Sequence, residues 1–438
     1  MRESSFHRFH RLILNKDVFL FVMGVLSLIK VKVMGTLALA ELIVLFATFF
    51  IPWWRTLRVH GVSTLLRLAA LWLLAVILSD AYNGTDFVNS MKGTFNVVLL
   101  IINIPFACWA FYDSPRRMLY YWLGVGIGNI IQFYLFSSYE SEFEYDTWRV
   151  YAFDFFFLSV AGILYYKGRR RLGMLLAEGF AIWSLFHSSR NIFLCTTIAN
   201  ALLFYIHQIR KPSLAETLRG YKHRLILVAA SLGVGALIAS YAYEYTASHG
   251  LLGKNAYEKY LMQKNTEAGL ASGRVDFLIS WELIKDNPVW GYGSYAMDKD
   301  NYQERYYIRH GYYVHADDVD EDQLLPGHSY FLGAWVYSGI LSVPFWLYVL
   351  YLVAMCLKRG AMLRQPRLMG LIVMLIMSYV WKILFSPFAD RILFATFVVM
   401  LSFLCSDQYW RALPPSEGHG AVPSSPSRRP KRLWSRFR

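Results

Sequence analysis

His328 is the residue of this chain best suited to proton transfer. It stands in the segment LLPGHSYFLGAW, directly before a long apolar run. An unperturbed imidazole titrates at about pH 6.5, which suits a general base that takes a proton from a sugar hydroxyl. A histidine at the start of a helix is also commonly a capping or interface residue, and the sequence leaves this structural alternative open.

Two arginines have side chains suited to holding phosphate groups. Arg190 lies in HSSRN, a short polar segment between two apolar runs, and Arg274 lies in SGRVDFLISW, two residues after a candidate helix N-cap at Ser272. A guanidinium group makes bidentate contacts to phosphate oxygens, and a helix N-terminus favours anions. We therefore predict that both arginines bind a diphosphate and share a catalytic site with His328.

Four further cations lie on the predicted outer side of the membrane, where basic residues are disfavoured. They are Lys30, Lys32, Lys92 and Arg391. Each alone can be explained by a side chain that reaches the lipid headgroups. Together they favour an anionic ligand with a lipid tail and a sugar-bearing head, and all four are predicted to support diphosphate binding.

Acidic residues raise the competing hypothesis of a metal site. Asp298, Lys299 and Asp300 form an Asp-x-Asp motif, and a denser acidic run covers residues 317–322. Such oxygen ligands could bind Mg²⁺ or Ca²⁺, although a solvated acidic loop is the simpler interpretation. The four cysteines lie in apolar runs and are predicted to be core thiols: Cys108, Cys195, Cys356 and Cys405. We predict neither a metal nor a cofactor.

The elements that must position these residues are predicted to be membrane-spanning helices. Of the 438 residues, 56% are hydrophobic, against about 45–50% in soluble domains. Apolar runs of roughly 20 residues, the length that crosses a bilayer as a helix, recur along the chain. We predict an all-α polytopic membrane protein with about twelve transmembrane helices, at 18–29, 33–53, 62–79, 94–112, 118–136, 150–166, 172–186, 191–209, 225–245, 329–357, 368–384 and 391–406.

The distribution of basic residues predicts the orientation of these helices. KGRRR, DSPRR and the tail SRRPKRLWSRFR all fall on one side of the predicted membrane, which the positive-inside rule makes the cytoplasm. Basic cytoplasmic loops explain the net charge of +14 better than nucleic-acid binding does. Both termini are predicted to be cytoplasmic, with no removable signal peptide.

One long outer segment sets the predicted domain organisation. Residues 1–245 contain helices one to nine, and residues 246–327 form a loop too long for an idle connection. This loop is predicted to be a partly helical cap, in which FLISWELI forms a helix that DNPVWGYG ends. Residues 328–407 contain helices ten to twelve, and residues 408–438 form a disordered basic cytoplasmic tail.

Three motifs occur in order: the arginine between the seventh and eighth spans, SGR…W…NPVWGYG in the cap, and GHSYFLGAWVYSGI after it. Over about residues 172–350 this order resembles the bacterial O-antigen ligase and polymerase superfamily. The resemblance implies an inverting, metal-independent glycosyltransferase of the GT-C type in the bacterial inner membrane, with the cap and the active site facing the periplasm. Arg190 and Arg274 would then bind the diphosphate of an undecaprenyl-diphosphate-linked glycan, and His328 would act near the acceptor hydroxyl.

The resemblance allows two enzymatic functions, a ligase and a polymerase, which differ in their acceptor. A ligase, the predicted function, transfers the glycan to a lipid A–core sugar in lipopolysaccharide biosynthesis, whereas a polymerase transfers it to another lipid-linked repeat. Ligases often have His-Asn in the last motif, where this chain has His328–Ser329, so the polymerase stays open. A non-enzymatic transporter of lipid-linked glycans is less favoured, because it should show inverted repeats and broken helices, and the sequence pattern indicates neither.

Overall fold

The computed structural model describes residues 15–32, 36–51, 56–57, 59, 61–112, 114, 116–137, 142–187, 189–209, 241, 244–251, 257, 260–261, 275–299, 301–309, 324–360 and 368–406. Several predictions fall outside these residues. They concern most of the span at 225–245, the tail at 408–438, the acidic run at 317–322, and Arg274.

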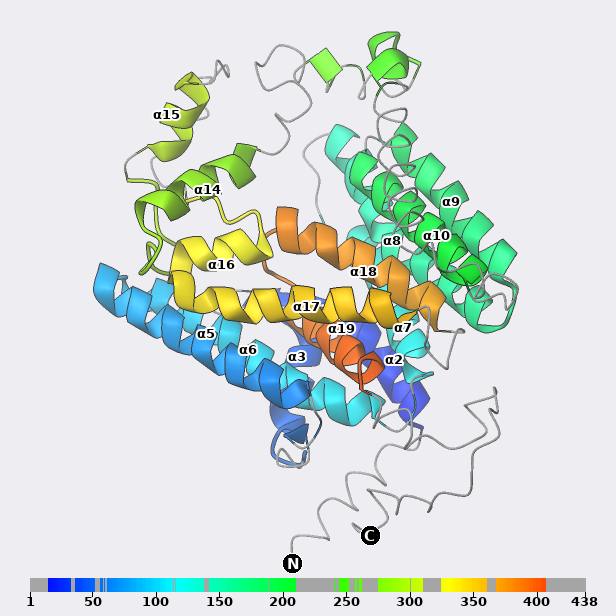
Figure 1. The fold of residues 1–438 in the computed structure, drawn as a ribbon, viewed down its shortest axis with the longest axis horizontal. Coiled ribbons are helices and arrows are strands. Elements are labelled where there is room, and N and C mark those ends of the chain that lie inside the picture. Colours follow the sequence, from blue (N-terminus) through cyan, green and yellow to red (C-terminus); the bar gives the residue numbers. More distant parts are fainter. Residues whose placement is uncertain are drawn as a thin grey trace, which may run out of the picture.

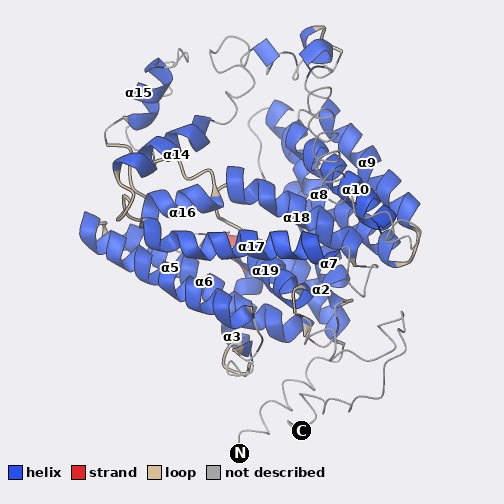
Figure 2. Ribbon diagram, in the orientation of Figure 1, coloured by secondary structure: helices blue, strands red, loops and turns tan. Residues whose placement is uncertain are grey.

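The described chain is mostly helical, as the sequence predicts. Its elements are α2 (Lys16–Leu26), β1 (Lys30–Lys32), β2 (Thr36–Ala38), α3 (Leu39–Ala47), α5 (Val62–Asn83), α6 (Phe87–Phe111), α7 (Arg117–Phe136), α8 (Glu142–Tyr166), α9 (Arg170–Phe186), α10 (Arg190–Ile209), α14 (Val275–Asp286), α15 (Tyr302–Arg309), α16 (Tyr330–Ser338), η4 (Ile340–Ser342), α17 (Val343–Gly360), α18 (Met369–Phe385) and α19 (Arg391–Leu404). Figure 2 shows that the described chain consists mainly of helices joined by loops. Its two strands, β1 and β2, form one short sheet.

Five described helices are long and apolar enough to cross a membrane. They are Val62–Asn83, Phe87–Phe111, Arg117–Phe136, Trp148–Tyr166 and Ile340–Lys358. Two shorter apolar helices, α18 and α19, complete the apolar bundle. By length and composition these are the helices of a membrane protein, while the count of twelve spans and the outer position of the cap stay predictions.

The helix α18 joins two groups of helices. The helices α7 to α10 pack against one another in chain order, and α5 packs against α6, α16 and α17. Figure 1 shows α17 crossing the front of the bundle, with α18 beside it. Because α18 contacts α8 and α10 as well as α16 and α17, any group near its C-terminal end is close to both halves of the molecule.

Two predicted spans differ from the structure. The segment at 33–53 begins with β2, which pairs antiparallel with β1, and continues as the nine-residue helix α3. Nine helical residues extend about 14 Å, less than half the hydrocarbon thickness of a bilayer. The segment predicted as one span at 329–357 is two helices, because Gly339 (φ 71°, ψ −172°) ends α16 before η4 and α17 begin.

The segment NPVWGYG fastens the cap to the helix bundle. Tyr292 N–H donates to Val336 O at 2.8 Å, and Gly293 N–H donates to Tyr337 O at 3.0 Å. These bonds join the segment to the C-terminal end of α16. The end of the bundle that meets α14 and α15 is called here the cap end.

The cap end of α5 holds the same segment from its other side. Asp80 accepts from Ser294 N–H at 2.6 Å and from Ser294 Oγ at 3.0 Å, and Asn83 Nδ2 donates to Gly291 O at 3.1 Å. Because backbone atoms of the segment make bonds on both sides, the turn predicted from DNPVWGYG also anchors the cap.

Gly339→Ala is expected to destabilise the protein more than Gly168→Ala. Both glycines have positive φ, but a Cβ on Gly339 would overlap Val289 O, whereas a Cβ on Gly168 would meet nothing within 4 Å. The conformation of Gly339 lies in a region that is essentially confined to glycine, which costs other residues about 1–3 kcal/mol. Thermal unfolding in detergent checks this; equal losses for the two variants would contradict the fastening role of the turn.

Candidate functional site

The C-terminal end of α18 lies between two segments that carry candidate residues, the start of α16 and the start of α19. Lys382 Nζ donates to Asp390 Oδ2 at 2.7 Å, which links α18 to the residue before α19. Ser329 Oγ donates to Ile383 O at 2.8 Å, which links α18 to the residue after His328. The start of α16, the end of α18 and the start of α19 are therefore held together by polar contacts.

His328 forms a pair with an aspartate of the cap. Its Nδ1 lies 3.1 Å from Asp276 Oδ2, in the first turn of α14. With the proton on Nδ1 and donated to Asp276, Nε2 keeps a free lone pair that can take a proton. The His328 side chain is 58% exposed, so a substrate hydroxyl can reach it. Packing between the rings of Phe277 and Phe385, with centroids 5.6 Å apart, holds α14 against α18.

Asp276 is a residue that the sequence analysis missed. It lies in the same segment as Arg274, in SGRVDFLISW. A carboxylate that orients an imidazole is a common feature of histidine bases. The sequence shows that Asp276 and His328 each lie in one of the motifs that carry the family resemblance. It does not show that they pair, because the pairing depends on how α14 packs.

Arg190 begins α10 beside a small cavity. The following residue, Asn191, accepts a hydrogen bond from Tyr151 Oη at 3.0 Å. The cavity lies between α8, α10 and α18, has a volume of about 70 Å³, and has room for a few water molecules. It is lined by Tyr151, Asp154, Leu158, Asn191, Ile192, Cys195, Thr196, Met374, Ser378, Trp381, Lys382 and Ser386. Asn191 and Lys382 thus share one polar cavity, which connects the start of α10 to the end of α18.

Lys382 and Asp154 are two further ionisable residues that line this cavity and that the sequence predictions did not include. Lys382 Nζ lies 4.9 Å from the ring centroid of Phe155 and 5.4 Å from that of Tyr379, so the ammonium group is surrounded by aromatic faces. Ionisable residues within apolar helices are rare and usually functional. Their position inside predicted spans could therefore have marked both residues as candidates. The sequence alone does not show which residues lie next to them.

The carboxyl of Asp390 is held in its charged form by neighbouring cations. Burial of this group opposes its ionisation, but Lys382, Lys30 and Arg391 together outweigh burial and lower the pKa of Asp390 from its usual value. Lys30, an exposed residue of β1, is thereby close enough to act on the cap end of α19. Lys30 and Arg391, two of the cations predicted to bind diphosphate, thus act here on a carboxylate of the protein itself.

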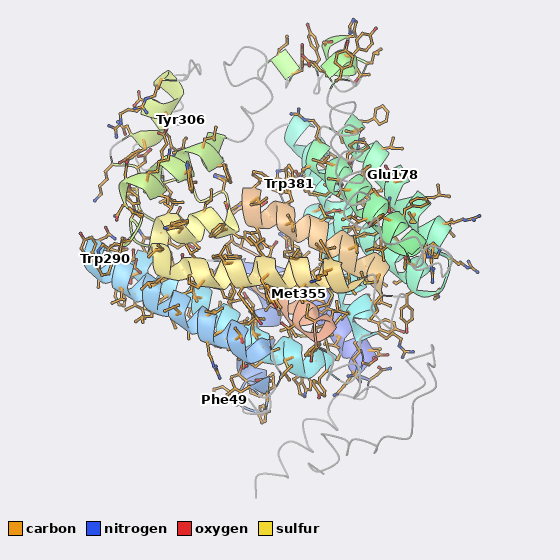
Figure 3. All side chains as sticks on the ribbon, viewed as in Figure 1. Phe49, Glu178, Trp290, Tyr306, Met355 and Trp381 are labelled. Carbon is orange, nitrogen blue, oxygen red and sulfur yellow. The ribbon has the colours of Figure 1, made fainter. Side chains whose placement is uncertain are left out.

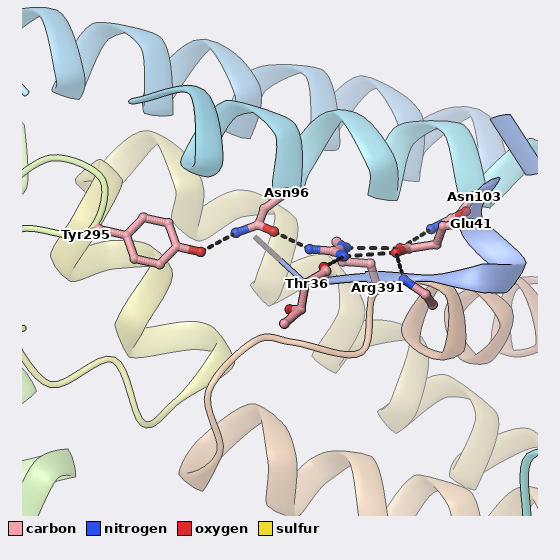
Figure 4. Close-up of polar contacts among 7 residues, drawn as sticks. Thr36, Glu41, Asn96, Asn103, Tyr295 and Arg391 are labelled. Atoms are coloured by element: carbon pink, nitrogen blue, oxygen red, sulfur yellow. Dashed lines mark hydrogen bonds and ion pairs between the residues drawn. The ribbon is translucent and has the colours of Figure 1, made fainter. Parts of the chain in front are cut away.

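Arg391 is committed to a buried ion pair, shown in Figure 4. Its Nε and Nη2 donate to Glu41 Oε1 at 3.0 Å and Oε2 at 2.9 Å, and its Nη2 also donates to Thr36 O at 2.7 Å. Its Nη1 donates to Asn96 Oδ1. Both charged side chains are nearly inaccessible, at 8% for Arg391 and 2% for Glu41. These contacts favour a structural role over the predicted diphosphate contact.

The remaining predicted cations have different environments. Lys92 lies inside α6, which begins at Phe87, and its Nζ is 5.7 Å from the ring centroid of Tyr295 in the cap. Lys32 belongs to β1, and its side chain lies outside the described part, as Arg274 does entirely. The structure therefore connects Lys92 to the cap and leaves the predicted Arg190–Arg274 pair as a prediction.

Asp298, the first residue of the Asp-x-Asp motif, caps a helix in the described chain. Asp298 accepts from the backbone N–H of Tyr302 at 2.8 Å and of Gln303 at 2.9 Å. Its two oxygens thus stabilise the start of α15. Asp300 lies outside the described residues, and within the described ranges no three His, Cys, Asp or Glu side chains gather as a metal site.

Comparison with known proteins found no match: no protein-family model matches this chain, and no curated protein matches it. A functional assignment therefore depends on the residues at the cap end of α18.

Glu41→Ala is expected to destabilise the protein strongly, because it leaves the Arg391 guanidinium buried without its counter-charge. Breaking a buried ion pair by removing one partner costs about 3–5 kcal/mol. The double variant Glu41→Leu with Arg391→Met should be closer to wild type, since it removes both charges. Thermal unfolding of purified protein measures both losses, and a Glu41→Ala variant as stable as wild type would contradict the structural role of the pair.

Proposed function

We propose that this protein is an O-antigen ligase-like membrane glycosyltransferase. It would transfer a glycan from undecaprenyl diphosphate to a sugar hydroxyl of lipid A–core, in the bacterial inner membrane with its active site facing the periplasm. The observation that carries the proposal is the His328–Asp276 pair, whose ring nitrogen and carboxylate oxygen are 3.1 Å apart, at the end of a bundle of apolar helices. A base at the cap end suits a substrate whose lipid tail lies among such helices and whose sugar lies beyond them.

The proposed chemistry needs one base and an anion-binding group. The acceptor oxygen attacks C1 of the donor sugar, its proton moves to His328 Nε2, and the C1–O bond breaks with its electron pair leaving on the diphosphate. Attack from the face opposite the leaving group inverts C1. Arg190 and Arg274 are assigned to the diphosphate, because preorganised cations stabilise charge that develops in the transition state. A diphosphate so stabilised leaves without a metal.

A repeat-unit polymerase of the same superfamily is the second candidate, and Ser329 keeps it open. This residue follows His328 where ligases often have asparagine, and its hydroxyl accepts from Leu332 N–H at 2.9 Å as the N-cap of α16. The same His328–Asp276 base serves either acceptor, so the acceptor itself must be identified by experiment.

The lipopolysaccharide of a deletion strain tests the proposed function. Loss of a ligase leaves lipid A–core without the transferred glycan, while polymer accumulates on the lipid carrier. Loss of a polymerase instead leaves lipid A–core with a single repeat. An unchanged lipopolysaccharide and surface-polysaccharide profile, with the protein shown to be expressed in the parent strain, would contradict both.

Arg190→Lys is expected to lower the transfer rate although the positive charge is retained. A lysine ammonium cannot reproduce the bidentate contact of a guanidinium with phosphate oxygens. By analogy with the loss of an oxyanion-hole donor, the rate should fall about 10²–10³-fold. Transfer from purified lipid-linked donor, normalised to folded protein, measures the change; a rate equal to wild type would exclude a geometric role for Arg190.

His328→Ala is expected to lower kcat by about 10²–10⁴-fold, the usual contribution of a general base, with donor binding nearly unchanged. Asp276→Asn should lower kcat less, because it removes the carboxylate that orients the ring but keeps the base. His249→Ala is the matched control, since His249 is an exposed histidine elsewhere in the described chain. If His328→Ala lowers only the amount of folded protein, then this histidine is structural and the arginines act without it.

A further inference from the structure

A second cavity lies in the cap, apart from the end of α18. It is lined by Lys285 and by a set of charged and aromatic side chains: Glu282, Asp286, Tyr302, Arg305, Tyr306 and Arg309. Its volume is about 360 Å³, within the range of about 300–1,000 Å³ that ligand pockets occupy. Figure 3 shows Tyr306 high in the cap and well separated from Trp381 of α18, so this cavity is not part of the candidate catalytic site.

The cavity is lined by charged side chains of both signs, and its net charge is small. Three cations from α14 and α15 face two carboxylates of α14. Arg309 Nη1 lies 3.8 Å from Glu282 Oε2, and Tyr302 Oη donates to Asp286 Oδ2 at 3.0 Å. A phosphate or another multiply charged anion would lie close to both carboxylates, so its binding would be opposed by like charge. An apolar ligand would leave these polar groups without solvent.

The wall of the cavity is held by a small apolar core. Tyr306 is buried with Ile279 and Leu283 of α14, and this cluster continues into Leu332 and Val336 of α16. The helix α14 is thereby fixed between α15 and α16, so the backbone positions of the polar residues are set before a ligand arrives. Preorganisation of this kind lowers the entropy lost on binding.

A sugar ring matches this set of groups. Carboxylate and guanidinium groups each present two adjacent hydrogen-bonding atoms, which pair with neighbouring hydroxyls. The guanidinium of Arg305 lies 4.9 Å from the ring centroid of Tyr302, so one side of the group contacts the ring while its N–H groups can donate to an incoming ligand. Arg305 and Arg309 are both exposed at the cavity.

We propose that the cavity between α14 and α15 binds a sugar residue of the transferred glycan, at a distance from the sugar that reacts. That the ligand is this glycan rests on the proposed function; that it is a carbohydrate follows from the lining. Asp276 and Lys285 are about 14 Å apart along α14 and, at about 3.6 residues per turn, lie on opposite faces of the helix. A glycan held at both places would therefore cross from one face of α14 to the other, with its reacting end at His328.

Calorimetric titration of the full-length protein in lipid nanodiscs tests the site. The probe is the O-polysaccharide of the host strain, released from its lipid by mild acid, so that binding does not depend on the diphosphate or on transfer. Arg305→Ala should weaken binding by about 10- to 100-fold, the effect of losing hydrogen bonds to a charged group. Lys299→Ala is the matched control, because Lys299 is an exposed cap cation that does not line the cavity, and it should bind as wild type does.

Two further measurements make the assignment specific. Arg305→Lys should bind the glycan weakly, because it keeps the charge and loses the paired N–H groups. In the transfer reaction, Arg305→Ala should raise the KM for a long glycan donor and leave transfer from a single-repeat donor unchanged. Full rescue by lysine together with loss of binding at high salt would identify a site for anionic lipid headgroups and overturn the proposal.

The outcomes separate this inference from the proposed function. Absence of glycan binding by the wild-type protein, or equal binding by Arg305→Ala and Lys299→Ala, overturns the sugar site even where transfer is measured. Normal glycan binding that Arg305→Ala abolishes, in a protein whose deletion leaves lipopolysaccharide unchanged, supports the sugar site and overturns the transferase.

Discussion

The buried ion pair between Arg391 and Glu41 is the interaction on which the arrangement at the cap end depends. Transfer of two charges from water to a low-dielectric interior is costly, and the cost is offset only when geometry and additional hydrogen bonds are good. Here Glu41 also accepts from Ala38 N–H at 3.1 Å and from Asn103 Nδ2 at 3.2 Å. Through Asn96, whose Nδ2 donates to Tyr295 Oη at 3.0 Å, the network continues from α19, α3 and α6 into the cap.

The position of the candidate site follows from this network. Asp390 precedes Arg391 directly, so fixing the arginine also fixes the carboxylate that accepts from Lys382. The end of α18 is held in turn, and Ile383 O then accepts from Ser329 beside His328. A catalytic group needs its supporting residues in place before substrate binds. His328, the proposed base, is therefore held by Asp276 from the cap, and the neighbouring Ser329 is held by a chain of contacts that runs from Arg391 and Asp390 through Lys382 and Ile383.

Local patterns in the sequence predicted the helices well and their tertiary contacts poorly. Composition and apolar runs gave the helical membrane class, and DNPVWGYG was rightly predicted to end the helix at Asp286. The break at Gly339 was missed because the apolar run continues through it, and the two reasons for that glycine, its positive φ and the close approach of Val289, are visible only in the structure. Arg391 was assigned to a ligand because its partner Glu41 is 350 residues away in a segment predicted as a plain span. Pairings at such separations leave no periodic signal.

The proposed base and the proposed diphosphate-binding arginine are held by different parts of the structure. The histidine and its aspartate depend on how α14 packs against α16 and α18, through Phe277 and the apolar core that includes Leu283. Arg190 depends on the start of α10 and on the contact between Tyr151 and Asn191. These contacts do not include Arg391 or Glu41, but the network around that ion pair reaches the cap through Asn96 and Tyr295, so the cap and the ion pair are coupled at that point. In the proposed function, a ligase and a polymerase would share these helices and the same base, and the residue that separates the two candidates in this chain is Ser329 at the start of α16.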